Sequence, residues 1–284
     1  MARRPAVLSR VTDTECVSFL QWALPRLGLR WRGFRKVRGQ VCKRVERRMR
    51  ILGTNGPAAY MAYLDAHPDE WHVLDGLCTI SISRFYRDHR VFDALGDTVL
   101  PTLAARATRQ TDTTVRCWSA GCASGEEPYT LSLIWAERIR PHFPQAVLVV
   151  VATDIDDVLL ERARVACYPR SSLRELPPAW IDTAFARHND EYCLGDPWKA
   201  CVEFRLQDVR TDSPAGPFDL VLCRNVAFTY FEESVQQRIV SRLAEAISAN
   251  GFLVVGRHES LPSGAPFVCD IPGLGIYRQE PDRC

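Results

Sequence analysis

From residue 114 onward the chain alternates short apolar runs with helical stretches, and this alternation restricts the fold more than any other feature. The apolar runs lie at residues 114–119, 147–153, 202–206, 218–223 and 252–256. Helices are predicted over 128–140 and 156–166. Strands that alternate with helices predict a parallel sheet covered on both faces. We therefore expect an α/β fold, with residues 267–268 and 275–278 forming a closing antiparallel hairpin.

Two regions depart from this alternation. Before about residue 95 the pattern is helical, and one helix face is marked by Val37, Val41, Val45, Met49 and Leu52, which recur at spacings of four and three. Between residues 168 and 200 a proline pair and short mixed pieces predict a small insertion. We expect an N-terminal helical domain over 1–95 and an α/β domain over 96–284 that carries this insertion.

Charge is unevenly distributed along the chain. Residues 26–50 hold eleven Arg or Lys and one acid, a local charge of +10 against +2 for the whole chain, which leaves 2 − 10 = −8 elsewhere. Such a segment suggests an anionic partner, although a charge run is also typical of a solvated helix face.

The composition argues against several classes of protein. No apolar run is long enough to span a bilayer, and the first ten residues, MARRPAVLSR, lack the apolar stretch of a signal peptide. The eleven cysteines form no C-x-x-C and no metal-ligand spacing. We therefore expect reduced cysteines that behave as small buried hydrophobes, a cytoplasmic location and no metal.

The turn after the first predicted strand is rich in small residues and precedes a helix. Residues 119–128 read SAGCASGEEP, so the backbone can approach a ligand at the carboxyl edge of the sheet. The glycines do not fit G-x-G-x-x-G, which disfavours NAD. Asp154 ends the second strand, where a carboxylate can bind the hydroxyls of a ribose, and Asp156 is assigned to the helix cap. Asp208 is a candidate for the adenine amino group or a plain loop carboxylate.

Six segments in this order resemble the chemotaxis-receptor glutamate methyltransferase family, the CheR type. They are residues 41–50, ISRFYRD at 82–88, WSAGCASGEEPY at 118–129, ATDID at 152–156, CRNV at 223–226 and GIYR at 275–278. The resemblance implies a Rossmann-like methyltransferase sheet that holds S-adenosylmethionine, a helical N-terminal domain and a small antiparallel β subdomain at 168–200.

Carried over position by position, the resemblance implies a set of functional residues. The cofactor pocket would be lined by Ser81, Ser83, Arg87, Gly121, Glu127, Asp154, Asp208, Val209, Arg224 and Asn225. Arg87 would also orient the acceptor carboxylate, and Tyr230 would be catalytic. The receptor, an acidic helical protein, would be recognised by Arg44, Arg47, Arg48 and Arg50. As an alternative, Arg87 and Arg224 would only form ion pairs between the domains.

Three positions depart from the family pattern. Ser81 stands where the family has Asn, and Tyr86 replaces a second Phe. The family's Asn-Val-x-x-Tyr-Phe is one residue longer here, over 225–231, so Tyr230 reaches the active site only if the extra residue is absorbed locally. His258 is the one histidine placed near the strand ends, and a structural role is favoured for it.

Methyl transfer to a glutamate requires no general base, because a glutamate with a pKa of about 4.3 is already ionised at neutral pH.

Two other functions stay open. One is a methyltransferase for RNA or a small molecule, although few aromatic residues interleave the arginines. The other is a cofactor-binding module without transfer activity. A monomer is expected.

Overall fold

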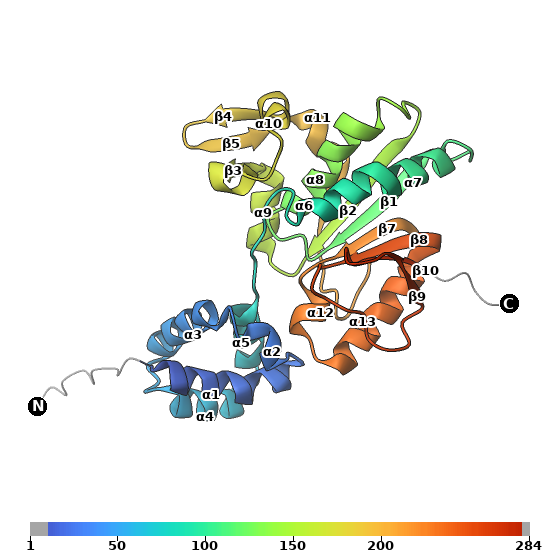
Figure 1. The fold of residues 1–284 in the computed structure, drawn as a ribbon. Helices are drawn as coiled ribbons and strands as arrows, with labels where there is room; N and C mark the ends of the chain where they lie inside the picture. Colours follow the sequence, from blue (N-terminus) through green and yellow to red (C-terminus); the bar gives the residue numbers. More distant parts are fainter. Residues whose placement is uncertain (1–10, 280–284) are drawn as a thin grey trace, which may run out of the picture. The chain divides into compact units, whose positions relative to one another are not determined.

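The computed structural model describes residues 11–279, and the chain divides into two compact units (Figure 1). Unit 1 runs to Ile80 and also holds Tyr230–Glu232, and unit 2 holds Ser81–Thr229 and the chain from Glu233 onward. The prediction about a signal peptide concerns residues 1–10 and lies outside the described residues.

The division at residue 80 precedes the predicted domain boundary at residue 95. The segment between them belongs to unit 2 because its apolar side chains are buried there. Phe85 and Val91 are fully buried, and Phe92 is 1% exposed, in the main hydrophobic core of that unit.

Unit 1 is helical, as predicted. Its elements are α1 (Asp13–Ala23), the 3₁₀ helix η1 (Leu24–Leu27), α2 (Trp31–Phe34), α3 (Arg38–Leu52), α4 (Pro57–Ala66) and α5 (Glu70–Cys78). In α3 the side chains of Val41, Val45 and Met49 are buried, which confirms the apolar face expected from the sequence. The helix ends at Gly53, whose φ of 68° places it in the left-handed region that glycine adopts without strain.

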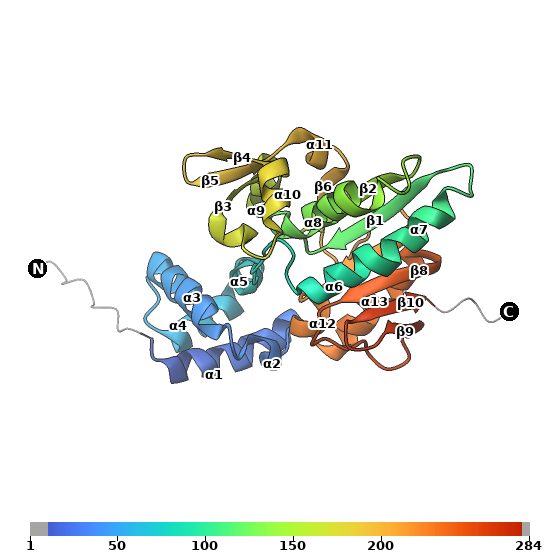
Figure 2. The same cartoon turned by 45° about the horizontal axis from the view of Figure 1, so that its top comes forward.

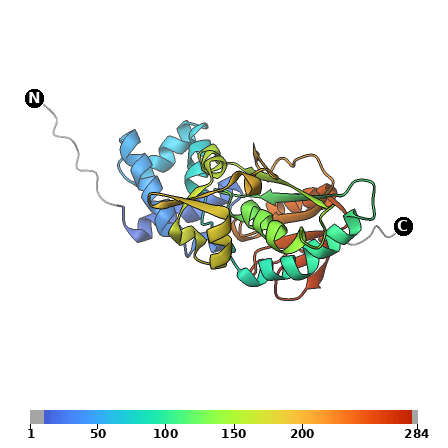
Figure 3. The same ribbon diagram turned by 90° about the horizontal axis from the view of Figure 1, so that it is seen from above.

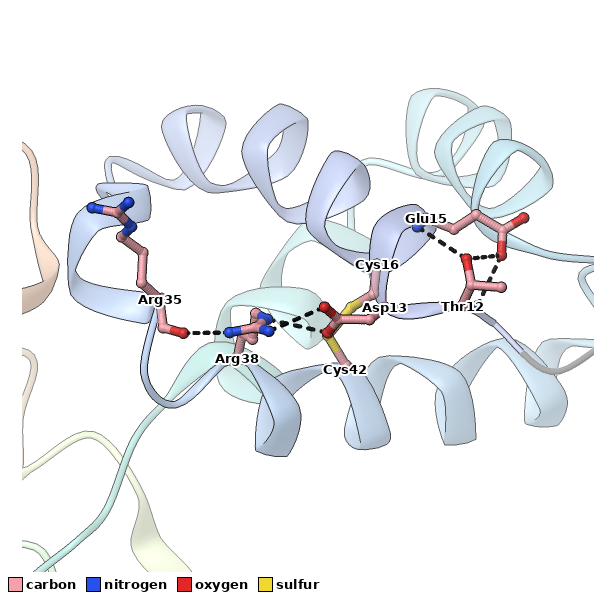
Figure 4. The surroundings of a disulfide bond; sticks show 7 residues. All are labelled: Thr12, Asp13, Glu15, Cys16, Arg35, Arg38 and Cys42. Atoms are coloured by element: carbon pink, nitrogen blue, oxygen red, sulfur yellow. Dashed lines mark hydrogen bonds and ion pairs between the residues drawn. A yellow bond between two sulfur atoms is a disulfide. The ribbon is translucent and has the colours of Figure 1, made fainter.

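A disulfide joins the first and third helices of unit 1. Cys16 on α1 and Cys42 on α3 are bonded, with their Cα atoms 6.0 Å apart. Beside this bond Arg38 pairs with Asp13 at 3.0 Å (Figure 4). A second disulfide joins Cys167 and Cys193 in unit 2. The expectation that the cysteines are reduced was therefore wrong for these four, because spacing along the chain does not reveal which pairs the fold brings within bonding distance.

Unit 2 contains a seven-stranded sheet in the order β6-β2-β1-β7-β8-β10-β9. The strands are β1 (Thr114–Ala120), β2 (Val147–Asp154), β6 (Val202–Leu206), β7 (Phe218–Cys223), β8 (Ile247–Val255), β9 (Phe267–Ile271) and β10 (Ile276–Gln279). The first five pair in parallel, and β10 pairs antiparallel with both β8 and β9. This confirms the α/β sheet and its closing hairpin.

Helices cover both faces of this sheet (Figure 2). They are α6 (His89–Ala94), the π-helical turn η2 (Leu95–Val99), α7 (Leu100–Ala107), α8 (Glu126–Ile134), the π-helical turn η3 (Trp135–Ile139), α9 (Asp157–Val165), the short α12 (Ala227–Tyr230) and α13 (Glu233–Ala246). The crossover from β1 to β2 through α8 runs one way along the sheet, and that from β7 to β8 through α13 runs the other way. Since crossovers between parallel strands are right-handed in nearly all proteins, these opposite directions place α8 and α13 on opposite faces of the sheet.

The predicted insertion forms its own layer (Figure 3). It contains β3 (Cys167–Pro169), the 3₁₀ helix η4 (Arg170–Leu173), α10 (Pro178–Ala184), β4 (Phe185–His188), β5 (Glu191–Leu194) and α11 (Asp196–Lys199). Its three strands are antiparallel in the order β3-β5-β4. Leu173, Ile181 and Phe185 join the main core of unit 2, so the insertion is packed against the unit rather than tethered to it.

Candidate active site

The strand order of unit 2 reverses between β1 and β7, which are neighbours in the sheet. The chain continues outward from β1 to β2 and β6 on one side, and from β7 to β8 on the other. In an open α/β sheet a ligand binds in the crevice at the carboxyl ends of the strands where this reversal occurs. The loops after β1, β2 and β7 meet at this edge.

Gly121 lies in the loop after β1, at the point where the strand order reverses. Gly121 has a φ of 78°, and its N–H donates to the carbonyl of Thr153 at 2.8 Å. A Cβ on Gly121 would lie 2.7 Å from Val226 Cγ2, which is in the loop after β7. Gly121 is therefore required for the close approach of these two loops, and its contact with a cofactor stays a prediction.

Asp154 lies at the carboxyl end of β2 and is 8% exposed. Its Oδ2 accepts the N–H of Ala123 at 2.8 Å, its Oδ1 accepts the N–H of Asp156 at 3.0 Å, and Ile155 N–H also bonds it. Burial raises the pKa of Asp154, and the three N–H groups act against this rise. An ionised carboxylate has about four acceptor positions, so about one is left for a ribose hydroxyl. Asp156 caps α9 through the N–H groups of Val158 and Leu159, as predicted.

A buried arginine joins three parts of the site. Arg224 follows β7, and its side chain is 2% exposed. Its Nη1 donates to Glu127 Oε2 at 3.0 Å, and its Nη2 donates to Asp88 Oδ2 at 2.7 Å and to the carbonyl of Arg87 at 2.9 Å. The guanidinium also lies 4.9 Å from the centre of the Phe92 ring. Arg224 therefore holds the segment before α6 against the sheet edge through ion pairs within unit 2.

Glu127 connects this cluster to the end of β1. Its second oxygen, Oε1, accepts the hydroxyl of Ser119 at 2.8 Å, and its side chain is 14% exposed. The predicted site residues Glu127 and Arg224 are thus brought together by a direct ion pair.

The segment before α6 holds three further predicted residues. Ser81 is exposed, whereas Ser83 and Arg87 are half-buried. Arg87 donates from Nη1 to the carbonyl of Ile82 in its own turn. Ser83 hydrogen-bonds Glu126, a carboxyl only 3% exposed whose pKa is raised by burial. The sequence reading missed Glu126, although its place at the start of α8 next to Glu127 was a signal.

The loop after β6 contains Asp208 and Val209. Asp208 forms an ion pair with Arg210 at 2.8 Å, and its side chain is 24% exposed. Val209 is 8% exposed, and its carbonyl accepts from Arg242 Nη1 at 3.2 Å. Asp208 would have to share its carboxylate between Arg210 and an adenine amino group.

The loop after β7 is fastened by an acid that the sequence reading did not single out. Glu259 Oε2 accepts the N–H groups of Asn225 at 2.8 Å and of Gly256 at 2.6 Å, and Oε1 accepts the Thr229 hydroxyl at 2.6 Å. Burial raises the pKa of Glu259. Its neighbour His258 is exposed. The sequence feature that could have indicated Glu259 is its position, four residues after the buried apolar run that ends β8 at Val255.

Tyr230, the predicted catalytic tyrosine, belongs to unit 1. Its ring centre lies 5.2 Å from that of Phe34, and its carbonyl accepts the N–H of Arg30 at 2.8 Å. The next residue, Phe231, pairs with Leu29 in an antiparallel bridge. The catalytic role of Tyr230 stays a prediction.

The four predicted recognition arginines fall into two pairs on α3. Arg47 and Arg50 are exposed. Arg44 donates to the carbonyls of Leu77 and Thr79, so it joins α3 to the end of α5. Arg48 forms a two-point ion pair with Glu70 on α5, at 2.8 and 2.7 Å.

Between residues 11 and 279 no group of three or more His, Cys, Asp or Glu side chains could hold a metal ion. None of the described helices is both long and apolar enough to cross a membrane.

The residues at the sheet edge fit S-adenosylmethionine. They combine a buried carboxylate with acceptor capacity at the end of β2, a close backbone turn after β1 and an ion-paired arginine after β7. A nucleoside ribose requires acceptors of this kind at this place in an open α/β sheet.

Comparison with known proteins identifies the family. The family described as CheR methyltransferase, SAM binding domain, matches residues 81–269. A probable chemotaxis protein methyltransferase from Rhizobium etli is 31% identical over 84% of this chain and 90% of its own length. The chemotaxis protein methyltransferase of Salmonella typhimurium is 31% identical over 87% of this chain and 84% of its own length.

Other similarities are partial. An uncharacterized 104.1 kDa protein from Rhodobacter capsulatus is 29% identical over 78% of this chain, which spans only 23% of that protein. The solved N-methyltransferase NodS from Bradyrhizobium japonicum aligns with a TM-score of 0.30 at 15% identity, over 58% of this chain and 64% of that one, too weakly to bear on function. The family match covers most of the chain, as do the two relatives from Rhizobium and Salmonella. This chain therefore belongs to the CheR methyltransferase family and is an S-adenosylmethionine-dependent methyltransferase.

Proposed function

We propose that this enzyme methylates glutamate side-chain carboxylates of a chemoreceptor-like signalling protein. S-adenosylmethionine supplies the methyl group from its sulfonium when it is bound. The observation that carries the proposal is the chemistry of the sheet edge. The polar candidate side chains there are carboxylates, arginines, serines and an asparagine, and the nearby thiols are buried. Burial raises the pKa of the Cys122 and Cys223 thiols far above neutrality, so neither provides a thiolate base.

A carboxylate acceptor is consistent with this set of residues. A glutamate is already ionised at neutral pH, so the protein only needs to align it and exclude water. Arg87 is the cation that we assign to the acceptor carboxylate. We propose that cofactor contacts come from Ser81, Ser83, Gly121, Glu127, Asp154, Asp208, Val209 and Asn225, and that Arg224 acts by fixing Asp88 and Glu127.

The exposed face of α3 supports an acidic helical partner. Lys43, Arg47 and Arg50 are all exposed, and their spacings of four and three place them on one face of the helix. Exposed charges of this kind accelerate encounter with an acidic protein, and the effect weakens as salt is added. We infer that Arg47 and Arg50 contact the receptor, whereas Arg44 and Arg48 act mainly within unit 1.

The test uses S-adenosylmethionine with a labelled methyl group. The enzyme is incubated separately with receptor cytoplasmic fragments, RNA and whole lysate. Label on protein that is released by mild base supports glutamate methylation. Alkali-stable label on RNA would contradict the proposal and support the RNA reading, and cofactor binding without transfer to any acceptor would also contradict it.

We also propose that the enzyme acts as a monomer in the cytoplasm, where a receptor's cytoplasmic region would meet it. Disulfides are rare in that compartment, whereas this structure contains two. The redox state of their cysteines in the cell therefore tests the proposed location. Cell fractionation combined with alkylation of the unlysed cells gives both the compartment and the state of Cys16 and Cys42. Size-exclusion chromatography gives the oligomeric state.

A further inference from the structure

We propose that Glu259 is a positioning residue of the methyl-transfer site, because it fixes the turn after β7 from which Arg224, Asn225 and Val226 extend. The inference rests on the methyltransferase activity and not on the identity of the acceptor.

Glu259 binds both ends of this turn at once. It accepts the Asn225 N–H at the start of the turn and the Thr229 hydroxyl on α12, at 2.8 and 2.6 Å. It also accepts the N–H of Gly256, at 2.6 Å, just after β8. One carboxylate therefore joins the carboxyl ends of the two neighbouring strands β7 and β8.

The turn that Glu259 contacts has an uncommon backbone conformation. Asn225 has a φ of 57°, in the left-handed region that most residues with a side chain adopt at some cost and that asparagine tolerates better than most. The family's motif is also one residue longer in this chain, over 225–231, and this lengthened segment is the one that Glu259 contacts. The two hydrogen bonds from Glu259 to residues 225 and 229 span most of that lengthened segment.

The neighbours of Asn225 carry the effect to the rest of the site. On one side Arg224 holds Asp88 and Glu127 through its guanidinium. On the other side Val226 packs against Gly121, since a Cβ on Gly121 would lie only 2.7 Å from Val226 Cγ2. A shift of the turn would therefore move both the arginine cluster and the loop after β1.

A side chain at position 256, which faces Glu259, would not fit. A Cβ on Gly256 would lie 2.7 Å from Glu259 Oε2 and 2.8 Å from Asn225 Oδ1. The carboxylate is thus in close contact with the backbone that it organises, as a positioning group must be.

The first test replaces the carboxylate in two ways. Glu259→Gln keeps the shape, since its amide oxygen can accept the two N–H groups and its amide N–H can donate to Thr229. Glu259→Ala leaves those groups unpaired. We expect Glu259→Ala to weaken S-adenosylhomocysteine binding, measured by calorimetry, and to lower kcat, each by about tenfold or more, while Glu259→Gln stays within about threefold of wild type. Wild-type binding of S-adenosylhomocysteine tests the cofactor site separately.

Two further variants separate positioning from loss of stability. Asp270→Ala removes the 2.9 Å ion pair with Arg278 on β9, the strand at the edge of the sheet. It should lower the thermal midpoint without changing the affinity for S-adenosylhomocysteine. Thr229→Val removes one of the three hydrogen bonds and should weaken the affinity about twofold to fivefold; it decides the question if Glu259→Ala does not fold.

Three results would overturn the proposal. The first is a folded Glu259→Ala with wild-type affinity and kcat. The second is Glu259→Gln impaired as much as Glu259→Ala, because that would make charge rather than position the cause. The third is Thr229→Val with unchanged affinity.

Discussion

Each unit contains an arginine that forms ion pairs with acidic side chains, but a different member of the cluster is buried in each unit. In unit 1, Arg48 on α3 binds Glu70 on α5 by two hydrogen bonds of 2.8 and 2.7 Å; the arginine is 27% exposed and the acid 5%. In unit 2, Arg224 is 2% exposed, and its partners Asp88 and Glu127 are 32% and 14% exposed. The buried member is the acid in one cluster and the base in the other.

The inversion indicates different roles. Buried Glu70 also accepts the Tyr60 hydroxyl at 2.8 Å, so this cluster joins three helices of unit 1 and its arginine can still reach water. Buried Arg224 holds two acids that lie toward the sheet edge. Loss of Arg224 leaves two carboxylates without their cation, and one of them, Glu127, is only 14% exposed, whereas loss of Glu70 leaves a single arginine that is 27% exposed. Because an unpaired charge costs most where it is poorly hydrated, the loss of Arg224 should affect the protein more than the loss of Glu70.

The largest effect is expected from Arg224→Met. This change removes the cation between Asp88 and Glu127 and should lower the free energy of unfolding by about 3–5 kcal/mol, with methyl transfer reduced about a hundredfold. Arg224→Lys should restore little, since one ammonium cannot reproduce the planar guanidinium contacts. Urea unfolding and initial rates measure both; near wild-type values for Arg224→Met would remove the contrast between the clusters.

A smaller and more selective effect is expected at the two predicted ligand contacts. Asp154→Ala should mainly raise the KM for S-adenosylmethionine, by about tenfold, because it removes a charge-assisted hydrogen bond to the ribose. Arg87→Ala should mainly lower kcat, because it loses the alignment of the acceptor. Steady-state kinetics with each substrate varied separates the two, and unchanged activity in both variants would reject the site assignment.

The exposed arginines should have a modest effect that depends on salt. The double variant Arg47→Ala, Arg50→Ala should raise the KM for the acceptor about threefold to tenfold at low ionic strength, with little effect near 0.5 M salt. The affinity for S-adenosylhomocysteine serves as the control and should not change. An equal loss at all salt concentrations would argue against electrostatic recognition by this face of α3.

The smallest effect on catalysis is expected from Glu70→Gln, although it should reduce stability. The hydrogen bond from Arg48 lowers the pKa of Glu70, so its contribution is present above the unfolded-state pKa and is lost as the pH falls through the folded value. Unfolding of the wild type should therefore become easier below about pH 4.5, and Glu70→Gln should lose part of that dependence. Equal acid sensitivity in both proteins, or a fall in kcat near neutral pH, would contradict this role.

Much of this protein could be predicted from local patterns. Apolar runs and helical periodicity depend on neighbouring residues, so β1, β2, β6, β7 and the buried face of α3 were located within a few residues. Asp156 was correctly assigned to the cap of α9, since capping involves only the adjacent turn. The family motifs likewise indicated the methyltransferase fold.

Other features depend on residues that only the folded chain brings together. Cys16 and Cys42 are 26 positions apart and bond because α1 and α3 pack side by side. Arg48, for which a role in receptor recognition stays a prediction, forms an ion pair with Glu70 on α5, 22 positions along the chain. The Glu259 contact with Asn225 spans 34 positions between two strand ends. A sequence determines its own periodicity and local turns, whereas partners far along the chain are selected by the tertiary packing, because hydrogen bonds and ion pairs act over only a few ångströms.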